Sequence, residues 1–107
     1  APKESLPYFM TAAELDNNQD AEVQFQYGLA LCHLEMFNQA INQLKIVLSI
    51  DSKHVDALYN IGLATYMDTE DLDLAMSYFD KAISIDPNHL LSQHAKKTFE
   101  AIKNEEE

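Results

Sequence analysis

The sequence predicts an all-α fold built as a short stack of antiparallel helical hairpins. Residues 21–54 and 55–89 superimpose as two copies of one segment: Gly28 matches Gly62 at a spacing of 34 residues, and Asp51 matches Asp86 at a spacing of 35. Self-similarity at such a period is the sequence signature of solenoid proteins. Apolar residues recur at helical spacing and no stretch alternates with a period of two, so strands are not expected.

Each copy divides into two amphipathic helices. The first helix of the first copy is marked by Tyr27, Leu31 and Leu34, and its second helix by Ala40, Leu44 and Val47. Both sets follow the i, i+4, i+7 spacing of one helix face. Over the whole chain the pattern predicts helices near residues 6–16, 20–34, 37–50, 54–67, 72–85 and 88–103. Pro87 fits the first turn of the last of these helices, where its missing N–H costs nothing.

Small and aromatic residues recur at fixed places in the second copy. The motif runs through Tyr59-Asn60-Ile61-Gly62, then Ala75, Phe79 and Ala82, to Asp86-Pro87-Asn88, and the first copy carries a looser version of it. This motif resembles the tetratricopeptide repeat, although Gln24 and Leu58 stand where the family usually has tryptophan.

The resemblance implies a right-handed solenoid of about six helices. We expect Gly28 and Gly62 to let the second helix of each hairpin approach closely, with Ala40 and Ala75 receiving the first helix. The structural repeat positions are then Gly28, Ala40, Gly62, Ala75, Phe79, Ala82 and Pro87.

The flanking segments extend the pattern over the whole chain, so we expect a single domain of residues 1–107. Residues 5–18 form a half repeat with only the second helix, and residues 90–103 form a first helix that caps the stack, followed by an acidic tail at 104–107. The cap has polar residues where a further second helix would pack: Gln93, Lys96, Lys97 and Glu100. The layout resembles the C-terminal part of a small cytoplasmic bacterial tetratricopeptide protein, and we expect the natural chain to be longer.

The charge balance narrows the class of partner. Seven Lys and Arg residues against 18 Asp and Glu residues give a formal net charge of -11 at pH 7. Nucleic-acid and anionic-membrane binding both depend on clustered basic side chains, so neither is expected. Cys32 is the one cysteine, which rules out an internal disulfide and favours the cytoplasm.

No catalytic or metal-binding motif emerges, and no cofactor is expected. His54 and His89 occupy the same position at the turn between repeats, which indicates a structural role. His89 and His94 lie five residues apart, which misses the i, i+4 spacing of two helical metal ligands. Cys32 is interpreted as a packing residue, and the acidic turn at 68–73 lacks the glycine of a calcium loop.

The resemblance also implies a function, because the first helices of such stacks line a concave groove that binds a protein or a peptide. The groove residues expected here are Glu22, Phe25, Gln26, Leu29, Asp56, Tyr59, Asn60, Leu63 and His94. Their mixture of apolar and acidic side chains suits an apolar or basic segment. The family's Lys, Asn and Arg clamp for a peptide carboxylate is not expected, because only Asn60 matches it and the other positions hold Phe25, Leu29, Leu91 and Ala95.

Three hypotheses of function follow. The first is a non-catalytic protein-interaction scaffold, whose groove residues stay partly exposed. The second is a self-assembly module that pairs through the exposed face of residues 5–16. The third is an enzyme, or the non-catalytic arm of an enzyme whose active domain lies upstream. Within the first hypothesis one alternative stays open: Phe25, Leu29, Tyr59 and Leu63 pack on neighbouring helices instead of facing a ligand.

Overall fold

The computed structural model describes residues 2–106 and contains six helices and no strand in that range. This confirms the all-α prediction. The helices are α1 (Pro2–Asp16), α2 (Ala21–His33), α3 (Phe37–Ile50), α4 (Val55–Thr69), α5 (Leu72–Ile85) and α6 (Leu90–Glu106).

The helix boundaries differ from the predicted ones mainly at the two ends of the chain. Helix α1 begins at Pro2 and continues through Pro7, although a proline inside a helix removes one main-chain hydrogen bond. Helix α6 begins at Leu90, so Pro87 lies in the preceding turn and the prediction that it opens the last helix is wrong. The last helix also continues to Glu106, through most of the segment expected to be a tail.

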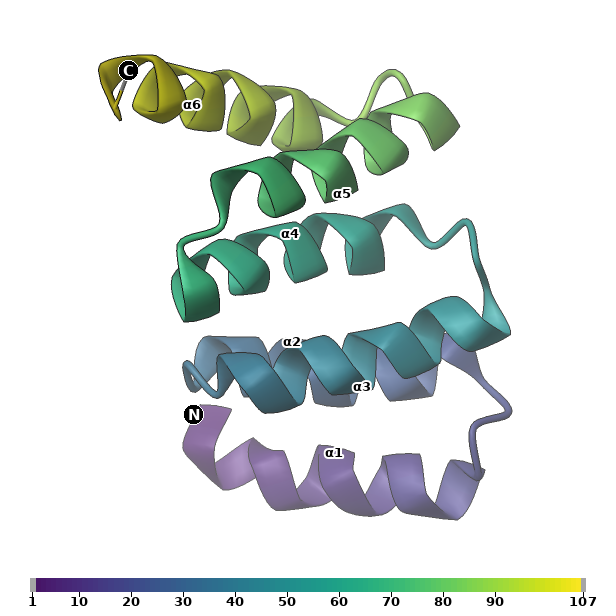
Figure 1. The fold of residues 1–107 in the computed structure, drawn as a ribbon. Coiled ribbons are helices and arrows are strands. Elements are labelled where there is room, and N and C mark those ends of the chain that lie inside the picture. Colours follow the sequence, from purple (N-terminus) through teal and green to yellow (C-terminus); the bar gives the residue numbers. More distant parts are fainter. Residues whose placement is uncertain (1, 107) are drawn as a thin grey trace.

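The helices stack in the order of the sequence, from α1 at one end to α6 at the other (Figure 1). Helices that are adjacent in the sequence pack against each other, and α2 also contacts α4. The result is an elongated body with principal extents of 46 × 26 × 19 Å. Stacking of this kind makes the surface of α2 and α4 continuous from one repeat to the next.

The repeated acidic residues stabilise the turns between helices by accepting main-chain hydrogen bonds. Asp51 and Asp86 follow the two second helices, and their carboxylates accept hydrogen bonds from the main-chain N–H groups of Lys53 (3.0 Å) and Asn88 (3.1 Å). Asp20 caps α2 by accepting from the main-chain N–H of Glu22 at 2.9 Å. These bonds satisfy donors that helix ends and turns otherwise leave unpaired.

The two glycines permit close contacts between the helices of each hairpin. A Cβ added at Gly28 would lie 2.7 Å from Cδ2 of Leu44, and one added at Gly62 would lie 2.6 Å from Cε1 of Phe79. The expected close approach is therefore present, but the side chains nearest the glycines are not Ala40 and Ala75. Those two alanines are fully buried one turn earlier on α3 and α5, where a small side chain lets the helices converge.

A buried polar network occupies the position where the family usually has tryptophan. The side-chain amide of Gln24 donates to the Ala13 carbonyl oxygen at 2.9 Å and to the Asp16 carboxylate at 3.1 Å. Gln43 in turn donates to the side-chain oxygen of Gln24 at 2.7 Å. Because Gln24 is 1% exposed, these bonds offset the cost of burying its amide and tie α1, α2 and α3 together.

Gly62→Leu should destabilise the fold by about 1–3 kcal/mol, because the added side chain overlaps the Phe79 ring in a fully packed site. Urea unfolding followed by circular dichroism measures the loss. Asp68→Leu places the same side chain on an exposed position of α4 and should change stability by no more than about 0.5 kcal/mol. Equal midpoints for the two variants would contradict the glycine contact.

Candidate functional site

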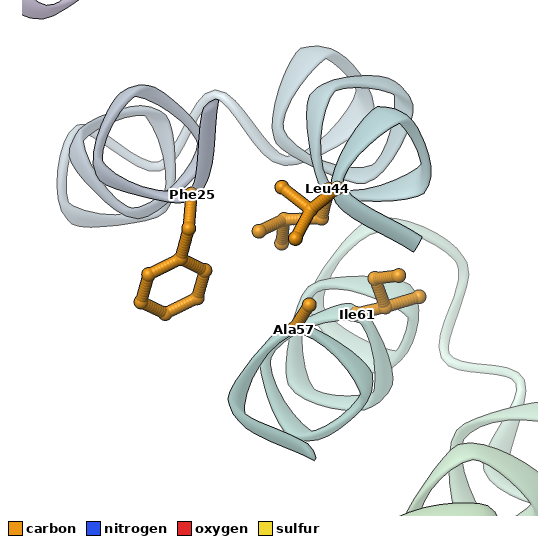
Figure 2. Packing of buried hydrophobic residues seen from close by; sticks show 5 residues of the cluster. Phe25, Leu44, Ala57 and Ile61 are labelled. Carbon is orange, nitrogen blue, oxygen red and sulfur yellow. The ribbon is translucent and has the colours of Figure 1, made fainter. Parts of the chain in front are cut away.

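Phe25, the first of the expected groove aromatics, belongs to the interior of the stack. It is 7% exposed and forms a core cluster with Leu44, Val47, Ala57 and Ile61. Figure 2 shows Phe25 from α2, Leu44 from α3, and Ala57 and Ile61 from α4 arranged around the same space. The prediction that Phe25 stays partly exposed is therefore wrong, because the first helix of the next repeat covers its ring.

Tyr59 occupies the same place one repeat later. Its ring lies 5.9 Å from that of Phe79 and 5.7 Å from that of His89, and it packs against the core cluster that contains Phe99 of α6. Tyr59 is half-buried, and this burial raises the pKa of its hydroxyl. Both aromatics thus connect one repeat to the next.

The two acidic residues of the expected groove pair with the histidines between repeats. Nε2 of His54 lies 3.6 Å from the Glu22 carboxylate, and Nε2 of His89 lies 3.0 Å from that of Asp56. Nδ1 of His54 accepts the main-chain N–H of Ala57 at 3.0 Å. In the neutral ring the hydrogen is therefore on Nε2, which points toward the carboxylate.

The other expected groove residues lie in several different environments. Gln26 donates to the Glu22 carboxylate at 2.8 Å, Leu29 packs against the Phe25 cluster, and Leu63 packs against the Phe79 cluster. Asn60 is half-buried on α4, and His94 is exposed on α6. A single continuous surface of all nine residues does not form.

A pocket of about 360 Å³ lies between the C-terminal end of α2 and the middle and C-terminal part of α4. Two of the expected groove residues, Asn60 and Leu63, line this pocket. Met67, which is 57% exposed, lines it as well. The full lining consists of Cys32, His33, Phe37, Asn60, Leu63, Ala64 and Met67. Its walls are mostly apolar, as in pockets that take one side chain of a ligand.

Asn60 gives this pocket a polar group. Its side-chain nitrogen donates to the Asp56 carbonyl oxygen at 2.8 Å. Among residues 2–106 no hydrogen bond is made to its side-chain oxygen. That oxygen is an acceptor for an N–H group of a ligand lying over the pocket.

Cys32 lines the pocket as a neutral thiol. Burial raises its pKa to about 11, so the thiolate form is scarce at physiological pH. The pocket therefore presents Cys32 as an apolar surface rather than as a nucleophile.

Within the residues described, no group of three or more His, Cys, Asp or Glu side chains could hold a metal ion. No helix there combines the length and hydropathy needed to cross a membrane.

Of the pocket residues, sequence reasoning had placed Asn60 and Leu63 in the expected groove, but the residues expected there did not include Cys32, His33, Phe37, Ala64 or Met67. Phe37 opens α3, directly after the hairpin turn that follows His33. A large aromatic residue at a hairpin turn was the available signal, because such a residue needs an apolar surface to cover.

The comparisons with known proteins agree with this architecture. Residues 55–89 match the family model for the tetratricopeptide repeat. The TPR protein YrrB, described as having an unusual peptide-binding site, is 43% identical over 90% of this chain with a TM-score of 0.83. The chain is a small tetratricopeptide-repeat domain. It spans 48% of the YrrB chain, about half of its length.

Two further tetratricopeptide structures share the fold at low sequence identity. The first tetratricopeptide domain of Spaghetti, bound to the HSP90 peptide SRMEEVD, is 13% identical over 96% of this chain and 80% of its own, with a TM-score of 0.87. PcrH, in complex with the chaperone-binding region of PopD, is 19% identical over 99% of this chain and 81% of its own, with a TM-score of 0.82. Proteins of this family are in general non-catalytic interaction modules.

Tyr59→Ala should cost about 1–3 kcal/mol of stability, less than the ~3–5 kcal/mol typical of a fully buried aromatic residue, because the ring is only half-buried. Tyr8→Ala is the matched control, since Tyr8 is 72% exposed and should be close to neutral. Thermal unfolding of the two variants, compared with the unaltered domain, measures the two losses of stability. Indistinguishable melts would mean that Tyr59 does not support the junction with α6.

Alkylation of Cys32 by iodoacetamide at pH 8 should be slow, because a pKa of about 11 against the ordinary 9.0 lowers the thiolate fraction by about a hundredfold. The rate should climb as the pH approaches 11. The guanidinium-unfolded chain serves as the control and should react at the rate of an ordinary thiol. A fast reaction of the folded domain at pH 8 would show that burial does not control the thiol.

Proposed function

We propose that this domain is a non-catalytic scaffold that binds a peptide segment of another protein in the pocket between α2 and α4. The observation that carries the proposal is the combination of an apolar lining with the unpaired side-chain oxygen of Asn60. The pocket would hold one apolar side chain of the peptide, and the Asn60 oxygen would accept a hydrogen bond from its main chain.

The electrostatic character of the domain favours basic residues on either side of that apolar side chain. The formal net charge is -11, and the exposed acids Glu35 and Asp68 directly adjoin the pocket-bearing segments in the sequence. Complementary charge raises the rate of encounter and helps to select the partner, although it adds less to affinity.

The related structures support a peptide or protein as the ligand. YrrB is described as having a peptide-binding site, and the domains of Spaghetti and PcrH were determined with peptide or protein segments bound. The carboxylate clamp is not expected here, because four of its positions hold Phe25, Leu29, Leu91 and Ala95. An internal apolar anchor fits this pocket better than a peptide C-terminus.

Selection of a random phage-displayed peptide library on the domain tests the proposal. The selected peptides should share one large apolar residue flanked by Lys or Arg. Met67→Asp should weaken their binding about tenfold or more, because it places a charge in an apolar pocket. Its effect on folding should be small, since the Met67 side chain is mostly exposed.

Leu74→Asp is the matched control. It makes the same change from an apolar to an acidic side chain at a 45% exposed position of α5 that is not part of the pocket. Binding should survive in this variant. Selected peptides that bind Met67→Asp and the unaltered domain equally well would refute the proposed pocket.

A further inference from the structure

The pocket between α2 and α4 has a counterpart in the same chain, one repeat further along the stack. Equivalent positions lie 34 residues apart at Gly28 and Gly62, and 35 residues apart at His54 and His89. By this spacing, most residues that line the pocket have a counterpart in one apolar cluster of the next repeat. The counterparts of Cys32, Phe37, Asn60, Ala64 and Met67 are, in that order, Tyr66, Leu72, Ala95, Phe99 and Ile102.

Two aromatic rings fill the counterpart. Tyr66 of α4 and Phe99 of α6 lie with their ring centroids 4.8 Å apart and their planes at 55°. The Phe99 side chain is 8% exposed. The corresponding positions between α2 and α4 hold Cys32 and Ala64, whose much smaller side chains both line the pocket. The pocket is therefore the space that two aromatic side chains fill one repeat later.

The walls of the pocket also suit an aromatic ring. Phe37 lines the pocket where the counterpart has Leu72, so a ring of a ligand gains an edge-to-face partner. Cys32 and Met67 contribute two sulfur atoms, and sulfur makes favourable contacts with the edges of aromatic rings. A saturated side chain of the same size would fill the volume without these contacts.

The polar group of the pocket belongs to the open junction and not to the filled one. The counterpart of Asn60 is Ala95, which is 5% exposed within the filled cluster. In the open junction the side-chain oxygen of Asn60 can accept a hydrogen bond from the main chain that carries a ligand ring.

We propose, on the basis of the function proposed above, that the peptide side chain held by this pocket is aromatic, a phenylalanine or a tyrosine. Its ring takes the space that Tyr66 and Phe99 fill between α4 and α6. The exposed acids Glu35 and Asp68, which adjoin the pocket-bearing segments in the sequence, favour basic residues beside this aromatic residue.

Benzyl alcohol and cyclohexylmethanol are the probes, because they carry the same hydroxymethyl group on an aromatic and on a saturated ring. Burial alone favours cyclohexylmethanol, since its ring is the more hydrophobic. Tighter binding of benzyl alcohol therefore reports contacts that are specific to an aromatic ring. An NMR titration of the whole 107-residue chain, labelled at its alanine and methionine methyl groups, measures both affinities at Ala64 and Met67.

Benzyl alcohol should bind about two- to tenfold more tightly than cyclohexylmethanol, as expected from contacts between aromatic rings. Equal affinities, a reversed order, or shifts confined to methyl groups outside the pocket would overturn the proposal.

Ala64→Phe copies Phe99 into the pocket and should weaken the binding of benzyl alcohol about tenfold or more, because the domain then fills the space itself. Ala101→Phe is the matched control: it makes the same change at an exposed position of α6 outside the pocket, and binding should be unchanged. Thermal unfolding checks that Ala64→Phe is folded. If it is not, Cys32→Tyr replaces it, because this change copies Tyr66 at a half-buried position of α2. A folded variant of either kind that binds benzyl alcohol as well as the unaltered domain would contradict the proposal.

The peptides selected by phage display separate the aromatic ligand from the peptide function itself. Phenylalanine or tyrosine at their shared apolar position would support both. Leucine or isoleucine there, with binding lost in Met67→Asp, would keep the peptide pocket and overturn the aromatic ligand. Binding of benzyl alcohol at Ala64 without any selected peptide would support the preference for a ring and refute the peptide scaffold. A concentration-dependent dimer that Ala64→Phe abolishes would assign the pocket to an aromatic residue of a second copy and overturn the peptide ligand.

Discussion

The stack depends on the close approach of the two helices of each hairpin at Gly28 and Gly62. Without a side chain at these positions, Leu44 and Phe79 lie directly against the main chain of the first helix. This approach fixes where the remaining side chains of the first helix can go. The large residues of the second helix fill the interior of the hairpin, and the aromatic three positions before the glycine is directed to the junction with the next repeat.

Because these aromatic residues pack between repeats, the candidate binding surface lies elsewhere on the first helices than the sequence predicted. Phe25 and Tyr59 were the natural anchors for a groove ligand, but both contribute to the packing between successive repeats. Glu22 and Asp56 are held in a similar way, because each lies beside the histidine that precedes a later helix. The accessible part of the first helices is toward their C-terminal ends. There α2 and α4 form the pocket together with the start of α3.

The two ends of the stack are chemically different. Helix α6 turns lysines and glutamate outward where a further second helix would pack, and Lys96 is engaged by Asp80. Helix α1 instead exposes Tyr8 and Leu15 and borders two hollows, one lined by α1 alone and one lying where α1 meets α2. The exposed surface of α1 is therefore mainly apolar, whereas the exposed surface of α6 is mainly charged.

The sequence by itself determined the helices, their order and their repeat. The spacing of Gly28 and Gly62 and of Asp51 and Asp86 is local information, since it reflects hairpin contacts and turn hydrogen bonds within one repeat. The same spacing predicted that residues 5–18 form a half repeat with only the second helix. Local periodicity identifies which face of a helix is apolar, and for the repeat positions Ala40, Ala75, Phe79 and Ala82 that is sufficient to predict burial.

Only the tertiary structure decided which apolar residues remain accessible. Phe25 and Leu63 lie on comparable sides of their helices, yet Phe25 is covered by Ala57 of the next repeat while Leu63 borders a pocket. This difference in accessibility depends on how far one repeat is rotated and shifted against the next. The sequence of a single repeat does not specify that rotation or shift. The pocket likewise combines the end of α2, the start of α3 and the middle of α4, and their meeting depends on the hairpin angle set at the glycines.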